Sequence, residues 1–200
     1  MALILAIPSG GKAQEPIDVS DSSWSLCRQA TAAAEAARDL PPHLLTAISR
    51  TESGRRHPAS AETLAWPWTV MAEGEGRFLP SKAAAIQEVR QLQARGVRNI
   101  DVGCMQVNLH YHPEAFEDLD AAFDPVVNVA YAASFLLELR EEARSWTRAV
   151  GQYHSRQAIR GNGYRAKVFK AWRDERHRAN RERRAALRAA REAARNDSES

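Results

Sequence analysis

Cysteine, β-branched residues and long apolar runs are all scarce in this chain of 200 residues. No apolar run approaches the ~20 residues that a membrane-spanning helix needs, which excludes a polytopic membrane protein. Alanine is plentiful where β-branched residues are few, so helix is expected to dominate. With 44% apolar and 26% charged residues, the composition is that of one globular domain whose core needs no disulfide to fold.

The two cysteines, Cys27 and Cys104, do not resemble a metal site, because neither belongs to a Cys-x-x-Cys pair. They are either two small buried apolar residues or one disulfide formed in an oxidising compartment, and both alternatives stay open. Nucleotide-binding glycine motifs, Gly-x-Ser-x-Gly and His-Glu-x-x-His are also absent. His110 and His112 are therefore interpreted as surface or core residues, and no metal or cofactor is expected.

Positive charge is concentrated at the C-terminal end. Residues 173–195 hold nine arginines and four acidic residues, a net charge of +5, whereas residues 1–172 hold 19 basic and 19 acidic residues. Aromatic residues do not interleave these arginines, so a nucleic-acid partner is not expected. We interpret residues 173–200 as a helical or disordered tail, dispensable for the body, that touches a protein partner or an anionic surface.

Residues 1–20 are interpreted as a signal-peptide remnant or a flexible N-terminus. The apolar run from Ala2 to Ile7 precedes small and polar residues, as in the second half of a secretory signal, but the basic start is missing. We therefore expect an exported protein whose true start lies upstream.

Residues 21–172 are expected to form one domain made mainly of helices. Capping residues and apolar spacing predict helices from Asp21 to Arg38, from Pro41 to near Gly54, over 81–95, from Asp124 to about Arg140, over about 145–155, and from near Tyr164. Two short apolar runs on either side of Gly-Glu-Gly at 74–76 predict a β-hairpin. The predicted fold is mainly α, with a small β-hairpin insertion and a C-terminal helical extension.

One carboxyl group occupies a position suited to acid catalysis. Glu52 ends an apolar helix, where the negative end of the helix dipole disfavours ionisation. Burial among apolar side chains would raise its pKa further and make it a proton donor near neutral pH, as protonation of a glycosidic oxygen requires. The alternative is an exposed glutamate that only ends a helix.

Four segments occur in an order that favours the catalytic interpretation. They are ISRTESG around Glu52, GCMQVN from Gly103, YAASFLLEL after Asn128, and AVGQYHS around Tyr153. Together they resemble the lysozyme-like lytic transglycosylases of the soluble lytic transglycosylase (SLT) type, family 1, over roughly residues 24–172. The resemblance implies a lysozyme-like (SLT) helical domain that acts on peptidoglycan in the periplasm or outside the cell.

The resemblance also assigns roles to individual residues. It implies that Glu52 acts first as general acid and then as general base, and that Asn128 is structural. It implies substrate-binding roles for Ser53, Met105, Gln106, Asn108 and Tyr153. The reaction implied is cleavage of the MurNAc–GlcNAc β-1,4 bond with formation of 1,6-anhydroMurNAc, without a cofactor. Alternatives are a hydrolytic lysozyme of the same fold and a non-catalytic peptidoglycan-binding module.

Two features depart from the family pattern. About fifty residues separate Glu52 from the Gly-x-Met-Gln motif, and this insert carries Trp66, Trp68 and Phe78 as sugar-stacking or packing aromatics. The insert resembles those of members tied to secretion, conjugation or flagellar assembly. The third motif reads Tyr-His-Ser instead of Tyr-Asn-Ala, and near the motifs Asp101 is the only other acidic residue.

Overall fold

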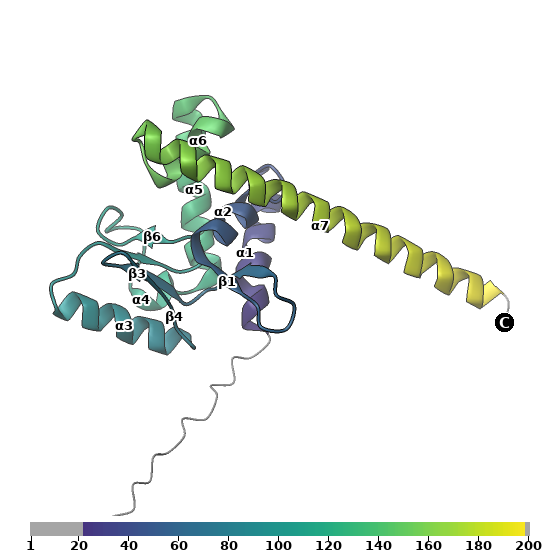
Figure 1. Cartoon of the computed structure of the whole chain (residues 1–200), viewed down its shortest axis with the longest axis horizontal. Helices are drawn as coiled ribbons and strands as arrows, with labels where there is room; N and C mark the ends of the chain where they lie inside the picture. The colour runs from purple at the N-terminus through teal and green to yellow at the C-terminus, as the bar shows by residue number, and fades with distance from the viewer. Residues whose placement is uncertain (1–21, 199–200) are drawn as a thin grey trace, which may run out of the picture.

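The computed structural model describes residues 22–198, which are built mainly of helices (Figure 1). The helices are α1 (Ser23–Ala37), α2 (Leu44–Ser53), α3 (Lys82–Ala94), α4 (Leu119–Ala122), α5 (Pro125–Ala143), α6 (Trp146–His154) and α7 (Ala158–Ser198). The strands are β1 (Gly54–Arg56), β2 (Thr63–Ala65), β3 (Thr69–Ala72), β4 (Glu75–Phe78), β5 (Ile100–Val102) and β6 (Val107–Asn108). The predicted mainly α fold is confirmed. The signal-peptide remnant expected at 1–20 lies outside the described residues.

Five helices close a ring around the main core. α1 packs on α2 and α5, α6 packs on α5 and α7, and α7 packs back on α2. Leu44, Leu45 and Ile48 of α2 are fully buried in this ring, at the spacing that predicted the helix. α5 begins as expected, because the Asp124 side chain accepts hydrogen bonds from two backbone N–H groups and Pro125 occupies the first helical position. Within residues 22–198 no helix combines the length and apolar character needed to cross a bilayer.

The sheet is larger than the hairpin predicted from the sequence. β3 and β4 form that hairpin, with Glu73 and Gly74 at positive φ in its turn, one residue earlier than the expected Gly-Glu-Gly. β5 and β6 extend it to a four-stranded antiparallel sheet in the order β4-β3-β5-β6, with α3 packed against it. The short segments of β5 and β6 lack a clear alternation, which is why the sequence did not predict them.

The two cysteines are joined, which decides between the alternatives left open above. The disulfide Cys27–Cys104 connects α1 with the loop between β5 and β6 across a Cα–Cα distance of 5.6 Å. A loop of 77 residues closed in the unfolded chain is expected to add about 4 kcal/mol of stability. The bridge therefore also fixes the loop that carries Met105 and Gln106.

α7 begins at Ala158, earlier than the predicted start near Tyr164. Gly161 lies in its first turn and serves helix packing. A Cβ on Gly161 would lie 3.0 Å from the backbone oxygens of Gly151 and Ser155, so the glycine lets α6 and α7 approach closely.

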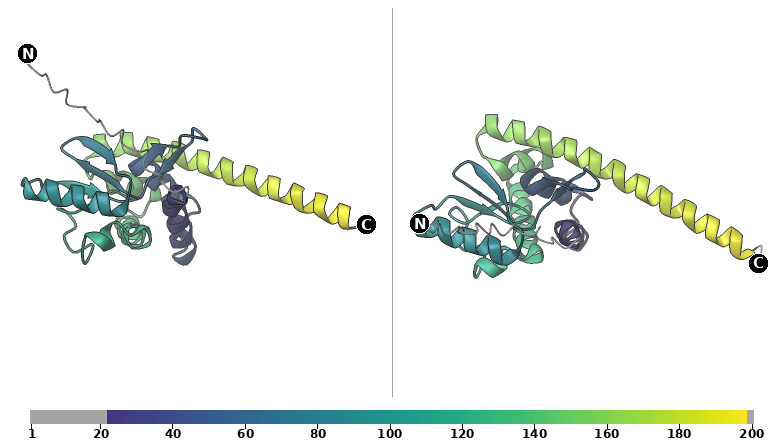
Figure 2. Two further views of the ribbon diagram at one scale, coloured as in Figure 1. Left: turned by 90° about the horizontal axis from the view of Figure 1, so that it is seen from below. Right: turned by 60° about the horizontal axis from the view of Figure 1, so that its bottom comes forward.

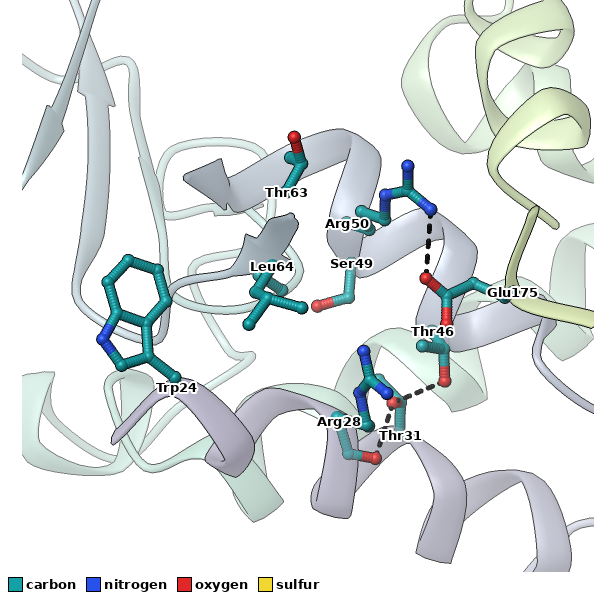
Figure 3. A pocket seen from close by; sticks show the side chains of 10 residues that line it. Trp24, Arg28, Thr31, Thr46, Ser49, Arg50, Thr63, Leu64 and Glu175 are labelled. Carbon is teal, nitrogen blue, oxygen red and sulfur yellow. Dashed lines mark hydrogen bonds and ion pairs between the residues drawn. The ribbon is translucent and has the colours of Figure 1, made fainter. Parts of the chain in front are cut away.

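α7 also continues without interruption through residue 173, where we expected the tail to begin. Trp172 donates a hydrogen bond to the Pro42 carbonyl at 2.8 Å. Glu175 is 3% exposed and accepts from Arg50 of α2 at 3.1 Å (Figure 3). It also pairs with Arg178. The pocket drawn there holds about 10 Å³, room for roughly one water. From Asn180 to Asn196 every residue is exposed, and the helix projects beyond the body in all views (Figures 1 and 2). The boundary that we propose between body and tail therefore lies near residue 179.

Two truncations test this boundary. A chain ending at Ala179 keeps the Arg50–Glu175 pair, so we expect its thermal unfolding to match that of the full chain. A chain ending at Trp172 leaves Arg50 without its buried partner. We expect its free energy of unfolding to fall by about 2 kcal/mol. This value lies between those of exposed and of buried ion pairs, because Arg50 is partly exposed. Glu175→Gln in the full chain is the matched control and should lose a similar amount. Equal unfolding temperatures for the two truncated chains would contradict the boundary.

Candidate active site

A cleft of about 640 Å³ opens between the sheet and helices α5 and α6. Its lining combines carboxylates, amides and aromatic rings from five elements, which are α2, β5, β6, α5 and α6, and from the loops between them. The polar and aromatic lining residues are Glu52, Asn99, Asp101, Gln106, Asn108, Tyr111, His112, Tyr131, Phe135, Gln152, Tyr153, His154, Ser155 and Arg156. Four of the six predicted site residues are thus brought together in one cleft, and the other two, Ser53 and Met105, are not among its lining residues.

Glu52 lies in the last turn of α2, and its side chain lines the cleft. Its side chain is partly buried, and burial raises its pKa from 4.5 to about 7. The nearby Asp101 carboxylate is a smaller cause of the same rise, because two like charges resist ionising together. Its place at the C-terminal end of a helix acts in the same direction. Glu52 is therefore substantially protonated at neutral pH.

Tyr164, on α7, is the neighbour of Glu52 that the sequence did not reveal. Its side chain is 7% exposed, and its hydroxyl meets no close hydrogen-bond partner among the described residues. Its looser contact with the carboxyl partly offsets the raised pKa of Glu52, since hydrogen bonding favours the charged form. Burial and the Glu52 charge raise the pKa of Tyr164 well above 10, so its hydroxyl stays protonated and can only donate to the carboxylate. The only sequence signal was an aromatic residue following two glycines.

Ser53 and Met105 support the cleft from behind, which differs from the substrate contact expected of them. Ser53 is 1% exposed, and its hydroxyl donates to the Cys104 carbonyl at 2.8 Å. Ser49 donates to the same carbonyl at 2.9 Å. Two hydroxyls of α2 therefore tie the end of this helix, and with it Glu52, to the loop after β5.

Asn128 of α5 holds the other side of that loop, in the structural role expected. Its amide oxygen accepts from the Met105 N–H at 2.9 Å, while its amide nitrogen donates to the Val102 and Ala122 carbonyls. Gly103 has φ +81°, and a Cβ there would meet the Asn128 amide at 2.4 Å. The glycine of the Gly-x-Met-Gln motif is therefore required by both its backbone angle and the space beside it.

Gln106 and Asn108 present amide groups to the cleft. The Gln106 amide nitrogen donates to the Thr69 carbonyl at 3.1 Å and to the Gly103 carbonyl at 3.0 Å, which orients its side chain. Asn108 donates to the Asp101 carboxylate at 2.7 Å. This hydrogen bond lowers the pKa of Asp101, but burial is the larger effect and leaves it raised. Asp101 is thus fixed in place by Asn108.

Tyr153 and His154 complete the cleft at the end of α6. The Tyr153 hydroxyl donates to the Met105 carbonyl at 2.9 Å, so the tyrosine braces the loop as well as lining the cleft. His154 stands where the family pattern has asparagine, and its ring stacks on that of Tyr164 with centroids 4.7 Å apart and planes at 11°. Burial lowers the pKa of His154, while the Asp101 carboxylate acts in the opposite direction. The histidine therefore buttresses the tyrosine that faces Glu52.

Of the other candidates from the sequence, the three aromatic residues of the insert lie outside the cleft, whereas His112 lines it. Trp66 is fully buried and donates to the Leu79 carbonyl, and neither it, Trp68 nor Phe78 lines the cleft. Trp66 packs between Trp24 and Trp68, which identifies packing as its role. His112 lines the cleft and its ring nitrogen lies 2.8 Å from the Tyr131 hydroxyl. Within residues 22–198 no three histidine, cysteine or acidic side chains gather as a metal site would need.

One comparison with known proteins identifies a family. A family model described as "Transglycosylase SLT domain" matches residues 29–172, which is well over half of the chain. Searches among curated proteins and among solved structures gave no significant match. The matched range includes every residue placed above around the cleft.

The contact between Tyr164 and Glu52 predicts a measurable change in pKa. In Tyr164→Phe the carboxylate loses a nearby hydroxyl that favours its charged form, so we expect the pKa of Glu52 to rise above its value of about 7. Titration of the Glu52 carboxyl carbon by NMR measures this directly. Tyr153→Phe is the matched control, because that hydroxyl is bonded to the Met105 carbonyl and its loss should move the pKa of Glu52 less. An unchanged Glu52 titration in Tyr164→Phe would rule out the contact.

Proposed function

The chain belongs to the transglycosylase SLT domain family, and from this premise we propose that it cleaves the MurNAc–GlcNAc β-1,4 bond of peptidoglycan and forms 1,6-anhydroMurNAc. Lytic transglycosylase action on peptidoglycan is the activity of this domain. The bond cleaved, the product and the residues responsible are our proposal. The observation that carries it is the position of Glu52, whose burial raises its pKa to about 7, in a cleft lined with amides and aromatic rings.

The proposed reaction uses Glu52 twice. The protonated carboxyl gives its proton to the glycosidic oxygen as the bond from this oxygen to C1 of the MurNAc ring breaks. The N-acetyl oxygen of the same ring supports the positive charge that develops at C1. The C6 hydroxyl then attacks C1 while the Glu52 carboxylate takes its proton, which restores the starting state. No water enters the product.

Tyr164 and Asp101 adjust Glu52 for these two steps. Donation from the Tyr164 hydroxyl stabilises the carboxylate that exists between the steps, and the Asp101 charge favours the protonated form that begins the cycle. Among the described residues that line the cleft, Asp101 is the only other carboxylate. Its side chain is engaged by Asn108 and its pKa is raised, so it is poorly suited to the permanently ionised nucleophile of a lysozyme.

We propose that Gln106, Asn108 and Tyr153 bind the glycan, because these three line the cleft beside Glu52. We propose that Ser53 and Met105 are positioning residues. Ser53 braces the loop between β5 and β6, and Met105 is part of that loop. Access to peptidoglycan requires a periplasmic or secreted protein. Local opening of the wall for a secretion, conjugation or flagellar apparatus is the cellular role that we propose.

Replacement of Glu52 tests the mechanism. Glu52→Gln removes the transferable proton, so we expect cleavage of purified sacculi to fall by at least about 10³-fold. Circular dichroism and thermal unfolding should show that the fold is kept. Glu117→Gln, an exposed residue outside the cleft lining, is the matched control and should remain fully active. A folded and active Glu52→Gln variant would remove Glu52 from the mechanism.

The mass of the products distinguishes the proposed reaction from hydrolysis. We expect every new glycan end to be one water lighter than a reducing end, because the C6 hydroxyl is the attacking group. Digestion in H₂¹⁸O followed by mass spectrometry should therefore incorporate no label. Labelled reducing ends would identify a lysozyme. Binding to sacculi without any cleavage would identify a non-catalytic module.

A further inference from the structure

Five of the six arginines beyond residue 180 lie on one side of the projecting part of α7, and the sixth, Arg183, lies away from them. Beyond the body, five arginines follow one another at alternating steps of three and four residues: Arg181, Arg184, Arg188, Arg191 and Arg195. At 3.6 residues per turn these positions fall within an arc of about 80°, along about 21 Å of the helix. We call this set the arginine stripe. Figure 1 shows this segment extending away from every other element.

Neither folding nor helix formation explains the arginine stripe. All five residues are exposed and lie beyond the last buried residue of α7, Glu175, so they add nothing to the core. Like charges three or four residues apart destabilise a helix, and the arginine stripe contains four such pairs in succession. Arg181, Arg184, Arg188 and Arg191 make no ion pair with any described residue. An arrangement that opposes its own helix indicates an external anionic partner.

The opposite side of the segment limits how that partner is bound. Ala186, Ala189, Ala190 and Ala193 lie there, together with Glu182 and Arg183. Leu187 is the only large apolar residue beyond residue 180, and it is 51% exposed. A face of alanines with one leucine gives too little apolar area to enter a lipid bilayer, so the segment would lie on a surface without inserting.

We propose that the arginine stripe lays the protein against an anionic phospholipid membrane. A straight row of guanidinium groups matches a flat array of phosphates, to which arginine donates two parallel hydrogen bonds. Residues 173–196 contain no aromatic side chain that would stack on nucleic-acid bases, which favours phospholipid over single-stranded nucleic acid. The choice of a membrane rests on the proposed function, since peptidoglycan is built next to one.

Binding through the arginine stripe would also orient the cleft. α7 is one uninterrupted helix from Ala158 to Ser198, and it is fixed to the body by the Arg50–Glu175 pair and by Trp172. Tyr164 of the same helix faces Glu52. Binding of the C-terminal end of α7 to a membrane would therefore fix the orientation of the cleft relative to the membrane, and with it the direction from which the glycan enters.

Vesicle binding by the full chain tests the proposal. We expect co-sedimentation with vesicles of phosphatidylcholine mixed with phosphatidylglycerol, weakening as salt rises, and little with phosphatidylcholine alone. In Arg184→Ala/Arg191→Ala, binding should fall about tenfold to thirtyfold. The matched control keeps the net charge by adding Ala186→Arg and Ala193→Arg to these two changes, which moves both arginines to the opposite side. It should bind as weakly as the double variant.

Several results would overturn the proposal. These are no binding to the anionic vesicles, equal binding to both kinds of vesicle, tighter binding to duplex DNA at the same salt, or wild-type binding by the charge-preserving control. The last would mean that net charge alone matters. Circular dichroism should show equal helix content for all variants, since alanine and arginine both favour helix. Glu52→Gln should bind vesicles like the wild type, so the proposed reaction and the membrane contact can fail independently.

Discussion

The rest of the structure depends on keeping one carboxyl group, that of Glu52, out of water. Burial raises its pKa from 4.5 to about 7, which corresponds to about 3 kcal/mol of preference for the protonated form. The folded chain binds this proton more tightly than the unfolded chain. Its contribution to stability is complete below pH 4.5 and is lost as the pH rises through about 7. At neutral pH, Glu52 therefore contributes less to the stability of the fold than it does at low pH. The burial that causes this loss is also what raises its pKa.

That loss is tolerable because the surroundings of Glu52 are unusually well fixed. The loop from Gly103 to Gln106 accepts hydrogen bonds from α2 and α6, donates one to α5, and is joined to α1 by a disulfide. Each of these elements belongs to the ring of helices around the core, so the loop cannot move without disturbing that ring. The motif residues around the cleft thus divide into those that face it, such as Gln106, and those that hold it, such as Ser53.

The sequence predicted the parts of this arrangement that are local. Apolar spacing in α2 and the cap at Asp124 located two helices, and the position of Glu52 after an apolar run indicated a raised pKa. Contacts between distant segments left no such pattern. Tyr164 reaches Glu52 only because Gly161 packs against α6, and Glu175 is buried only because Arg50 lies opposite it. In the sequence, Glu175 belongs to the charged segment that was interpreted as a tail. Gly161 lies before the predicted start of the last helix.

α7 shows why composition and burial place the end of the body at different residues. Charge changes sharply at residue 173, but burial ends only after Glu175, because an arginine of α2 supplies the partner that makes a charged residue a core residue. The same helix has three roles along its length: Tyr164 faces the Glu52 carboxyl, Glu175 fixes the helix to α2, and the end of the helix projects a row of arginines. Helical rigidity links these three, since a displacement at one end of an uninterrupted helix is carried to the other. A flexible tail with the same composition would carry the same charge, but it would not hold the arginines in a fixed direction relative to the body.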